Sequence, residues 1–395
     1  MEFFRLSKMK DEYLMNTYNR KDIAFKYGDG MYLWDENDRK YLDATCGLAV
    51  TGLGHSHPEI NEVFANQSKT LIHTSNAFVI KKQEKLAKRL CQLSGMDKAF
   101  FCNSGTEAVE TAIKISRKFG NDQKIIKPKI LVMSNSFHGR TIGALTATGN
   151  AEAHQGFEPL LEGFVRVPYN DIKSIKTKAS KYNSIVAVLL EPVQGEGGIV
   201  VPDENYLQEI REICDERNWL LMVDEVQSGL CRTGKWFAFQ HSQVLPDVVM
   251  IAKGLGNGMP IGACLARGIA GEVLSPGTHG STFGGNFLST SVSLKVLDIM
   301  RDQAICANAK AMGSYFQQKL IDKFDKHKSV KNIRCKGLMI GIELIKDCPD
   351  LVMQALKSGL IINVTKKKVV RLLPPLIIKK HHIDEIVNKL EALLK

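Results

Sequence analysis

Short apolar runs recur along the middle of the chain, and polar or glycine-rich residues follow each of them. Four of these runs have the length and β-branched content of buried strands: 129–133, 185–198 with its glycine-rich end, 219–223 and 248–252. A helical pattern separates neighbouring runs, for example over 203–218. From 100 to 262 this alternation predicts an α/β fold, with a mostly parallel sheet and helices on both faces.

The two ends of the chain show other patterns. Residues 28–43 alternate apolar and polar positions around a DEND turn, which predicts a β-hairpin, and a helix is expected to begin at Pro58. After a long helical pattern at about 287–325, apolar runs predict strands at 337–344 and 369–373, and an amphipathic helix follows. We therefore expect an N-terminal segment 1–62 that contributes to a small α+β domain, a large domain 63–285 and a C-terminal small domain 286–395.

Composition limits the class of protein. The 395 residues are 44% hydrophobic and 24% charged, as in globular proteins. No apolar run approaches the roughly 18 residues that span a membrane, and the N-terminus shows no signal peptide. Nine scattered cysteines form no C-x-x-C pair, so we expect reduced thiols and a cytoplasmic location.

The net charge of +11 leaves several partners open. A basic chain can bind nucleic acid. The lysines are spread along the chain, however, and the single local cluster, at 366–368, is short. An anionic cofactor with anionic substrates, or a lysine-rich proteome, explains the charge as well, and we expect no nucleic acid partner.

Lys253 follows the apolar run 248–252 and precedes Gly254, Gly256 and Gly258. Burial disfavours the charged ammonium and lowers its pKa, which suits an amine that attacks a carbonyl. Glycines let a planar ligand approach the backbone. The pattern indicates a Schiff-base lysine, although a surface lysine at an ordinary strand-to-loop junction has the same pattern.

Asp224 follows the apolar run 219–223 in the same way. A carboxylate at a buried strand end needs a positive partner, and a protonated pyridine nitrogen is one. An aspartate on a pyridinium nitrogen together with a Schiff-base lysine is the pairing of pyridoxal phosphate sites. The alternatives for Asp224 are a helix cap or a metal ligand, but no His/Cys cluster at ligand spacing accompanies it, so we expect no metal.

Two stretches are candidates for phosphate binding. Ser104, Gly105, Thr106 and Glu107 match the S-x-x-E capping box that opens a helix. A helix N-terminus with small residues accommodates a phosphate, although capping alone also explains the motif. The loop 278–286, THGSTFGGN, is rich in hydrogen-bond donors.

Several polar or aromatic residues follow predicted strand ends. Phe137 could stack on a flat ring and Arg140 could hold a carboxylate, although a packed Phe in an ordinary loop is the alternative. Because ligands of open α/β sheets lie beyond the carboxyl ends of the strands, we expect Phe137, Glu191, Asp224 and Lys253 to share one site.

These motifs together resemble the class III pyridoxal-phosphate-dependent aminotransferases. The resemblance runs nearly end to end, through YLDATCGLAVTGLGHSHPEI, NSGTEAVETAIK, SFHGRT, GFEPLLEGF, LEPVQGEGG, DEVQSGLCRTGKWFAFQH, AKGLGNGMPIGA, HGSTFGGN, KGLMIGIEL and VVRLLPPL. Two departures stand out: Cys231 where the family usually has glycine, and Phe287 where proline is common.

The resemblance implies a fold-type I transferase with pyridoxal 5'-phosphate as cofactor. The residues expected to contact the cofactor are Ser104, Gly105, Thr106, Phe137, Asp224, Val226, Gln227, Lys253 and, from the neighbouring subunit, Thr282. Lys253 is expected to bind the cofactor and carry the proton, and Asp224 to keep its pyridine nitrogen protonated. The active unit implied is therefore a homodimer with a shared active site.

The resemblance also implies substrate contacts. Arg140 and Ser281 are expected to contact the amine donor, and Arg371 the α-carboxylate of 2-oxoglutarate. Glu196 would neutralise Arg371 when the other substrate is bound, and Tyr18 would line the mouth of the site.

The activity implied is transfer of the δ-amino group of N2-acetylornithine to 2-oxoglutarate, in arginine biosynthesis. Ornithine, succinyl-diaminopimelate and 4-aminobutyrate are alternative donors, because the residues of the pocket mouth that separate them are not fixed by one sequence. An aminomutase of the same fold, which needs no 2-oxoglutarate, is a further alternative. A basic nucleic-acid-binding protein is another, but no recognition motif supports it.

Overall fold

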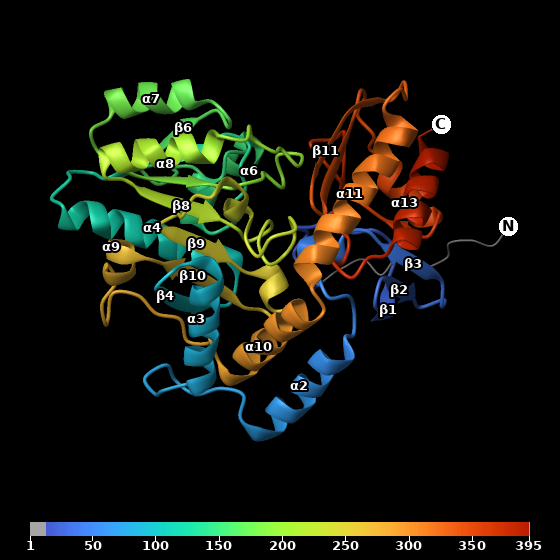
Figure 1. Cartoon of the computed structure of the whole chain (residues 1–395), viewed down its shortest axis with the longest axis horizontal. Helices are drawn as coiled ribbons and strands as arrows, with labels where there is room; N and C mark the ends of the chain where they lie inside the picture. The colour runs from blue at the N-terminus through green and yellow to red at the C-terminus, as the bar shows by residue number, and fades with distance from the viewer. Residues whose placement is uncertain (1–12, 395) are drawn as a thin grey trace.

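The computed structural model describes residues 13–394, which form a larger and a smaller lobe side by side (Figure 1). The larger lobe is built on a seven-stranded sheet whose strands, in spatial order, are β4 (Lys98–Cys102), β10 (Gly262–Ala266), β9 (Val248–Ile251), β8 (Leu220–Asp224), β7 (Ile185–Leu190), β5 (Lys129–Met133) and β6 (Phe164–Val167). Only β10 runs against its neighbours β4 and β9, and the other pairings are parallel. The mostly parallel sheet is therefore confirmed.

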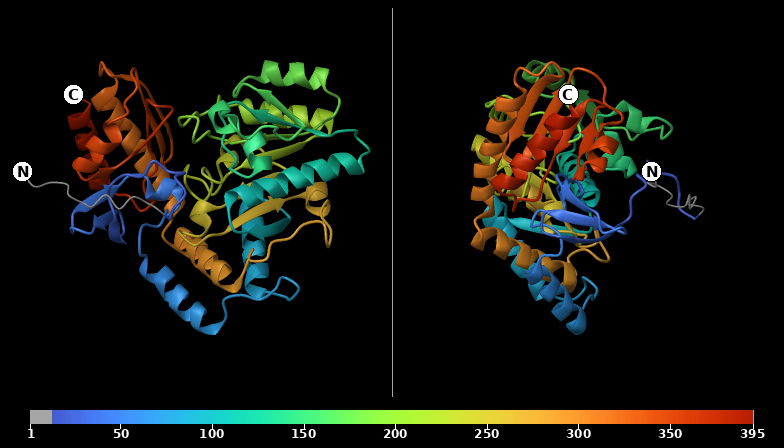
Figure 2. Two further views of the ribbon diagram at one scale, coloured as in Figure 1. Left: turned by 180° about the vertical axis from the view of Figure 1, so that it is seen from behind. Right: turned by 90° about the vertical axis from the view of Figure 1, so that its right-hand side faces the viewer.

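Helices cover both faces of this sheet, as Figures 1 and 2 show. They are α3 (Lys81–Ser94), α4 (Gly105–Asp122), α5 (Ile142–Ala147), α6 (Ala151–His154), α7 (Ile172–Lys181), α8 (Tyr206–Arg217) and α9 (Gly268–Glu272). Leu131 and Met133 of β5 belong to the apolar core that includes α8, whereas Ile130 and Val132 belong to the core that includes α4. Successive strand residues point to opposite faces, so a strand buried on both faces reads as an unbroken apolar run.

The smaller lobe holds two four-stranded sheets. The first is β1 (Phe25–Asp29), β2 (Tyr32–Asp35), β3 (Lys40–Asp43) and β13 (Leu360–Ile361), and the second is β11 (Val330–Lys336), β12 (Met339–Leu344), β15 (Val369–Leu372) and β14 (Asn363–Thr365). The predicted N-terminal hairpin is the antiparallel pair β2–β3. β13 adds to β3 in parallel, so the two ends of the chain share a sheet. The expected boundaries at 62 and 285 stay predictions.

Six further α-helices complete the fold of residues 13–394. They are α1 (Cys46–Ala49), α2 (Pro58–Thr70), α11 (Ile305–Phe324), α12 (Leu351–Lys357) and α13 (Lys380–Leu393), with α10 (Phe287–Asp302) joining the lobes. The pattern expected as one long stretch at 287–325 is thus two helices. The break falls at Ala304, whose φ of 50° lies in the left-handed region and ends the hydrogen-bond ladder of α10.

Two cysteines correct a sequence-based expectation. Cys231 and Cys306 form a disulfide, so the expectation that all nine thiols are reduced is wrong for this pair. The loop after β8 brings Cys231 to the first turn of α11, with 4.5 Å between the Cα atoms. Because 75 positions separate the two residues, only the fold brings them together.

Two kinds of feature are absent from residues 13–394. No helix in this range is long and apolar enough to cross a membrane. In the same range no three His, Cys, Asp or Glu side chains are grouped so that they could hold a metal ion.

Candidate active site

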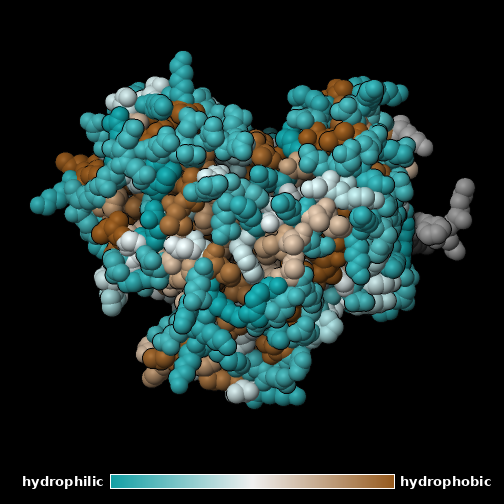
Figure 3. All heavy atoms as spheres, in the orientation of Figure 1, coloured by the Kyte–Doolittle hydropathy of each residue, from teal (hydrophilic) through white to brown (hydrophobic). Residues whose placement is uncertain are grey.

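A cavity of about 440 Å³ lies beyond the carboxyl ends of β5, β7, β8 and β9. In the space-filling view the surface is hollowed between the two lobes at its upper edge (Figure 3). Eleven of the residues predicted from the sequence line the cavity: Ser104, Gly105, Thr106, Phe137, Arg140, Glu191, Glu196, Asp224, Val226, Gln227 and Lys253. Segments as far apart in sequence as 104 and 253 therefore meet where parallel strands end together.

Lys253 follows β9 after one residue and lies in the left-handed region, with φ +44°. Burial lowers the pKa of its ammonium, and the positive charge of Arg371 lowers it further, whereas Asp224 and Glu196 oppose the shift. The net direction favours the neutral amine, which is the nucleophilic form. Lys253 is thus placed as its proposed role requires.

Asp224 ends β8 and is 4% exposed. One carboxylate oxygen contacts Nδ1 of His138 at 2.8 Å, and the other accepts the backbone N–H of Val226 at 3.0 Å. A buried carboxylate held on two sides keeps a fixed orientation toward the cavity. No function was predicted for His138 from the sequence. Its only signal there is its place in the stretch SFHGRT, two residues before Arg140.

Glu191 is a second buried carboxylate beside the cavity. Its oxygens accept the backbone N–H groups of Phe137 and Gly195, both at 3.1 Å. Burial raises its pKa to about 7. Glu191 thus ties together two loops that follow neighbouring strands, one carrying Phe137 and the other leading to Glu196.

The start of α4 forms part of the cavity wall. Ser104 is its N-cap, with its hydroxyl accepting from the N–H of Glu107 at 3.3 Å and donating to the Glu107 carboxylate at 2.9 Å. A Cβ on Gly105 would lie 2.7 Å from a methyl group of Val226, so only glycine fits there without movement. Backbone N–H groups at such a helix start, with small side chains around them, suit a phosphate.

The cavity also fits a flat, polar ring. Phe137 and Val226 both line it, and the guanidinium of Arg140 lies 5.4 Å from the centre of the Phe137 ring. The side-chain oxygen of Gln227 is buried and has no hydrogen-bond partner among residues 13–394. An unsatisfied buried acceptor in a cavity suits a ligand hydroxyl. Carboxylate, lysine, helix start and unpaired amide together match the chemistry of pyridoxal phosphate.

Arg371 does not line the cavity itself but contacts Glu196, which does. Its Nη1 donates to Glu196 Oε1 at 2.6 Å, and its Nε donates to Asn363 Oδ1 at 3.0 Å. The side chain of Arg371 is 1% exposed, whereas that of Glu196 is 36% exposed. The pair therefore joins a fixed cation to an anion that has room to move. Asn363, from β14, had no sequence signal.

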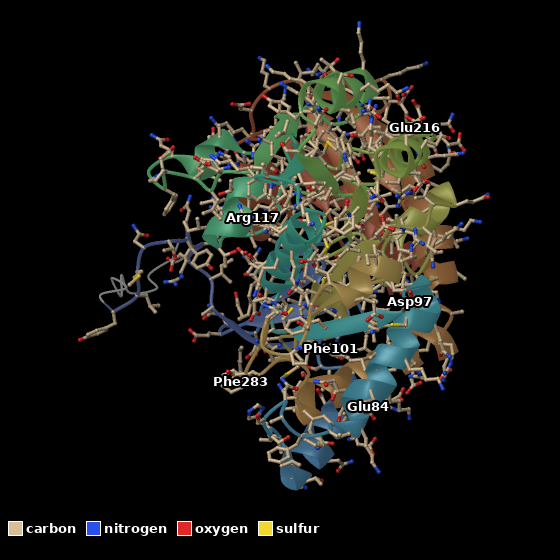
Figure 4. All side chains as sticks on the ribbon, turned by 90° about the vertical axis from the view of Figure 1, so that its left-hand side faces the viewer. Glu84, Asp97, Phe101, Arg117, Glu216 and Phe283 are labelled. Atoms are coloured by element: carbon tan, nitrogen blue, oxygen red, sulfur yellow. A yellow bond between two sulfur atoms is a disulfide. The ribbon has the colours of Figure 1, made fainter. Side chains whose placement is uncertain are left out.

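Four predicted residues lie outside the cavity lining: Arg371, described above, and Tyr18, Ser281 and Thr282. Tyr18 is 72% exposed. The hydroxyl of Ser281 accepts from Asn103 Nδ2 and from the N–H of Gly284, so within this chain it fixes its own loop. Thr282 follows it, and Phe283, 60% exposed, lies near the outline of the molecule in Figure 4.

Comparisons with known proteins point to one family. The family model described as "Aminotransferase class-III" matches residues 14–394. An acetylornithine aminotransferase of Nitrosomonas europaea is 52% identical, over 97% of this chain and 97% of its own length. The solved ornithine aminotransferase of Toxoplasma gondii superposes with a TM-score of 0.93 at 32% identity, covering 97% and 92% of the two chains. A second structure of that enzyme, with a TM-score of 0.92, 32% identity and the same coverage, shows partial occupancy of PLP at its active site.

Proposed function

Because this chain belongs to the class-III aminotransferase family, we propose that it moves the δ-amino group of N2-acetylornithine to 2-oxoglutarate. The products are N-acetylglutamate semialdehyde and glutamate, and the pathway is arginine biosynthesis. The 52% identity to an acetylornithine aminotransferase over nearly the whole chain supports this donor, against 32% to the ornithine enzyme. The proposal includes a cytoplasmic location, which rests on the biosynthetic role.

The chain is a transaminase that depends on pyridoxal phosphate. When bound, the cofactor supplies an electron sink for the pair left on the substrate carbon. Lys253 would hold the cofactor covalently until the substrate amine takes its place, and the freed neutral amine of Lys253 would then move the proton from the carbon that bears the amino group. Asp224, held by His138, would keep the pyridine nitrogen protonated. The start of α4 would hold the phosphate.

One observation explains how a single site can accept two unlike substrates: the ion pair of Arg371 with Glu196. Glutamate and 2-oxoglutarate carry a carboxylate beside the reacting carbon, whereas acetylornithine presents a terminal CH2–NH2 group. A buried guanidinium without a partner is costly, so Glu196 pairs with Arg371 during the half-reaction with acetylornithine. When an α-carboxylate arrives, the half-exposed Glu196 swings away and Arg371 binds the substrate.

The active unit in this proposal is a homodimer with a shared site. The loop 278–286 carries Thr282 at the surface, and Thr282 reaches the phosphate bound to the partner subunit. Exposed apolar side chains lie on this loop and on the segment 71–79, whose Asn76 donates to the carbonyl of Ser281: Leu71, Ile72, Phe78, Val79 and Phe283. Exposed apolar residues that gather in one region mark interfaces between proteins.

The test is the amine half-reaction, followed by absorbance in single turnovers with each amine alone. Among acetylornithine, ornithine, 4-aminobutyrate and succinyl-diaminopimelate, we expect acetylornithine to have the highest kcat/KM with the wild type. In Glu196→Ala the reaction with acetylornithine should fall about ten- to a hundredfold, the equivalent of a charge-assisted hydrogen bond, while that with glutamate holds or improves.

Arg371→Ala is the matched variant and should show the reverse preference, mainly weakening glutamate. A different donor at the top of the ranking would replace acetylornithine in the proposal. Equal losses for both amines in Glu196→Ala would show that Glu196 is structural and that another residue sets the specificity.

A further inference from the structure

Glu196 lies on a short closed turn between the two lobes. Gln194 and Val200 exchange both backbone hydrogen bonds, at 3.1 and 3.0 Å, and so close residues 195–199 into a loop, which we call the Glu196 turn. The turn follows β7 of the larger lobe. Side chains of the smaller lobe hold it.

A row of residues across the second sheet of the smaller lobe faces this turn. Arg334 of β11 lies opposite Gly341 of β12, which lies opposite Arg371 of β15, which lies opposite Asn363 of β14. Residues directly opposite in antiparallel strands project to the same face. Gly341 leaves a gap in this row, and a Cβ there would lie 3.0 Å from the carbonyl oxygen of Gly198. The turn therefore packs where the row lacks a side chain.

Two side chains of this face donate hydrogen bonds to the backbone of the turn. Arg334 donates from Nε and Nη2 to the carbonyl of Gly198, at 3.1 and 2.9 Å. Thr365 donates from its hydroxyl to the carbonyl of Glu196 itself, at 2.6 Å. Because Thr365 is two residues after Asn363 on the same strand, its side chain is on the same face. The two donors thus fix the turn at Glu196 and two residues beyond it.

This face carries two ion pairs: Arg334 with Glu343, which is permanent, and Arg371 with Glu196, which can open. Arg334 donates to Glu343 at 2.6 Å, and Glu343 is 13% exposed. The hydrogen bond from Arg334 lowers the pKa of Glu343 to about 2, against the effect of burial, so this pair stays charged at neutral pH. Arg334 therefore does not compete with Arg371 for Glu196, and it remains available to hold the turn.

We propose that Thr365 and Arg334 are positioning residues for Glu196, which keep the backbone of its turn fixed so that only the carboxylate moves. This inference rests on the proposed exchange of Glu196 and substrate at Arg371. A fixed backbone returns the carboxylate to the same place each time the α-carboxylate leaves. Thr365 and Arg334 thereby help set the preference between the ω-amine and glutamate without touching either.

The test compares amine half-reactions in four variants. Thr365→Val keeps the shape of the side chain and removes the donor, whereas Thr365→Ser restores the donor. Arg334→Gln removes the two bonds to Gly198. Lys331→Gln is the matched control, because Lys331 lies on β11 and pairs with Glu343 at 3.0 Å but makes no contact with the turn among the interactions of residues 13–394.

In Thr365→Val we expect the ratio of kcat/KM for the ω-amine to that for glutamate to fall about three- to tenfold, as for one lost hydrogen bond, and in Arg334→Gln at least as far, because two bonds to Gly198 are lost. Thr365→Ser and Lys331→Gln should keep the wild-type ratio. Equal losses for both amines, or an unchanged ratio in Thr365→Val, would overturn the positioning role. If Glu196→Ala shifts the ratio and these variants do not, the proposed function survives and only this inference fails. If the wild type reacts with no ω-amine, the proposed function fails first.

Discussion

Lys253 adopts a backbone conformation that few residues other than glycine adopt, with φ +44°. Such a conformation costs about 1–3 kcal/mol and persists only where the surroundings impose it. The glycine-rich segment that follows makes room for the tight 3-10 turn at Lys253–Leu255. The backbone conformation at Lys253 therefore helps to place its side chain in the cavity lining.

Lys253→Ala should reduce turnover by about 100- to 10,000-fold from the loss of proton transfer alone, while the fold persists. Steady-state assays and circular dichroism measure the two effects. Lys367→Ala is the control, because Lys367 is an exposed lysine that also has a left-handed backbone, with φ 62°. Borohydride reduction and peptide mapping of the wild type should place the pyridoxyl label on Lys253, and a label on another lysine would refute the assignment.

Residues that end buried strands were predictable, and those that act through other residues were not. Asp224 and Lys253 follow apolar runs, so their placement could be read along the chain. His138 and Asn363 matter because of what they contact, Asp224 and Arg371, and these contacts join positions 86 and 8 residues apart. The pattern of apolar and polar residues along the chain does not show which strands lie side by side, so these two contacts could not be predicted from it.

Among the elements, α4 combines two functions at one end. Ser104 caps the helix, and the same first turn is the proposed phosphate site. The capping box was readable from the sequence because it is local, whereas the approach of Val226 to Gly105 was not, because it depends on how β8 is placed beside α4. The break between α10 and α11 escaped prediction for a related reason: Ala304 is a strong helix former, and packing places it in a left-handed conformation.

Two substitutions separate the functions of α4. Ser104→Ala should lower the free energy of unfolding of the apo-protein by about 1 kcal/mol, through the lost cap. Thr106→Val should leave this stability nearly unchanged but weaken cofactor binding about ten- to a hundredfold, as expected for a lost hydrogen bond to a charged phosphate. Urea unfolding and titration of the apo-protein with pyridoxal phosphate measure the two quantities. An unchanged dissociation constant in Thr106→Val would remove Thr106 from the phosphate site.

At the scale of the whole molecule, the proposed dimer makes a prediction about mixed subunits. Lys253→Ala and Thr282→Glu should each inactivate the enzyme, the second by repelling the phosphate in the partner subunit. Refolding them together should restore activity to about a quarter of the wild type, because half of the dimers are hybrids and each hybrid has one intact site.

The control mixture pairs Lys253→Ala with Asp224→Ala. Both residues line the cavity of a single chain, so no hybrid of these variants has an intact site and no activity should return. If the first mixture stays as inactive as the control while sedimentation shows hybrid dimers, Thr282 does not serve the partner subunit.

The parallel pairing of β13 with β3 has a consequence for the order of folding during synthesis. Leu42 leaves the ribosome early, but its partner Leu360 is synthesised 318 residues later (360 − 42). The segments of the larger sheet, from Lys98 to Ala266, are complete long before that. Domains fold as units as they emerge, so the larger lobe can form while β3 still has an open edge. An open strand edge is a site of aggregation, so the edge of β3 stays exposed to misassembly from the synthesis of Asp43 until that of Leu360.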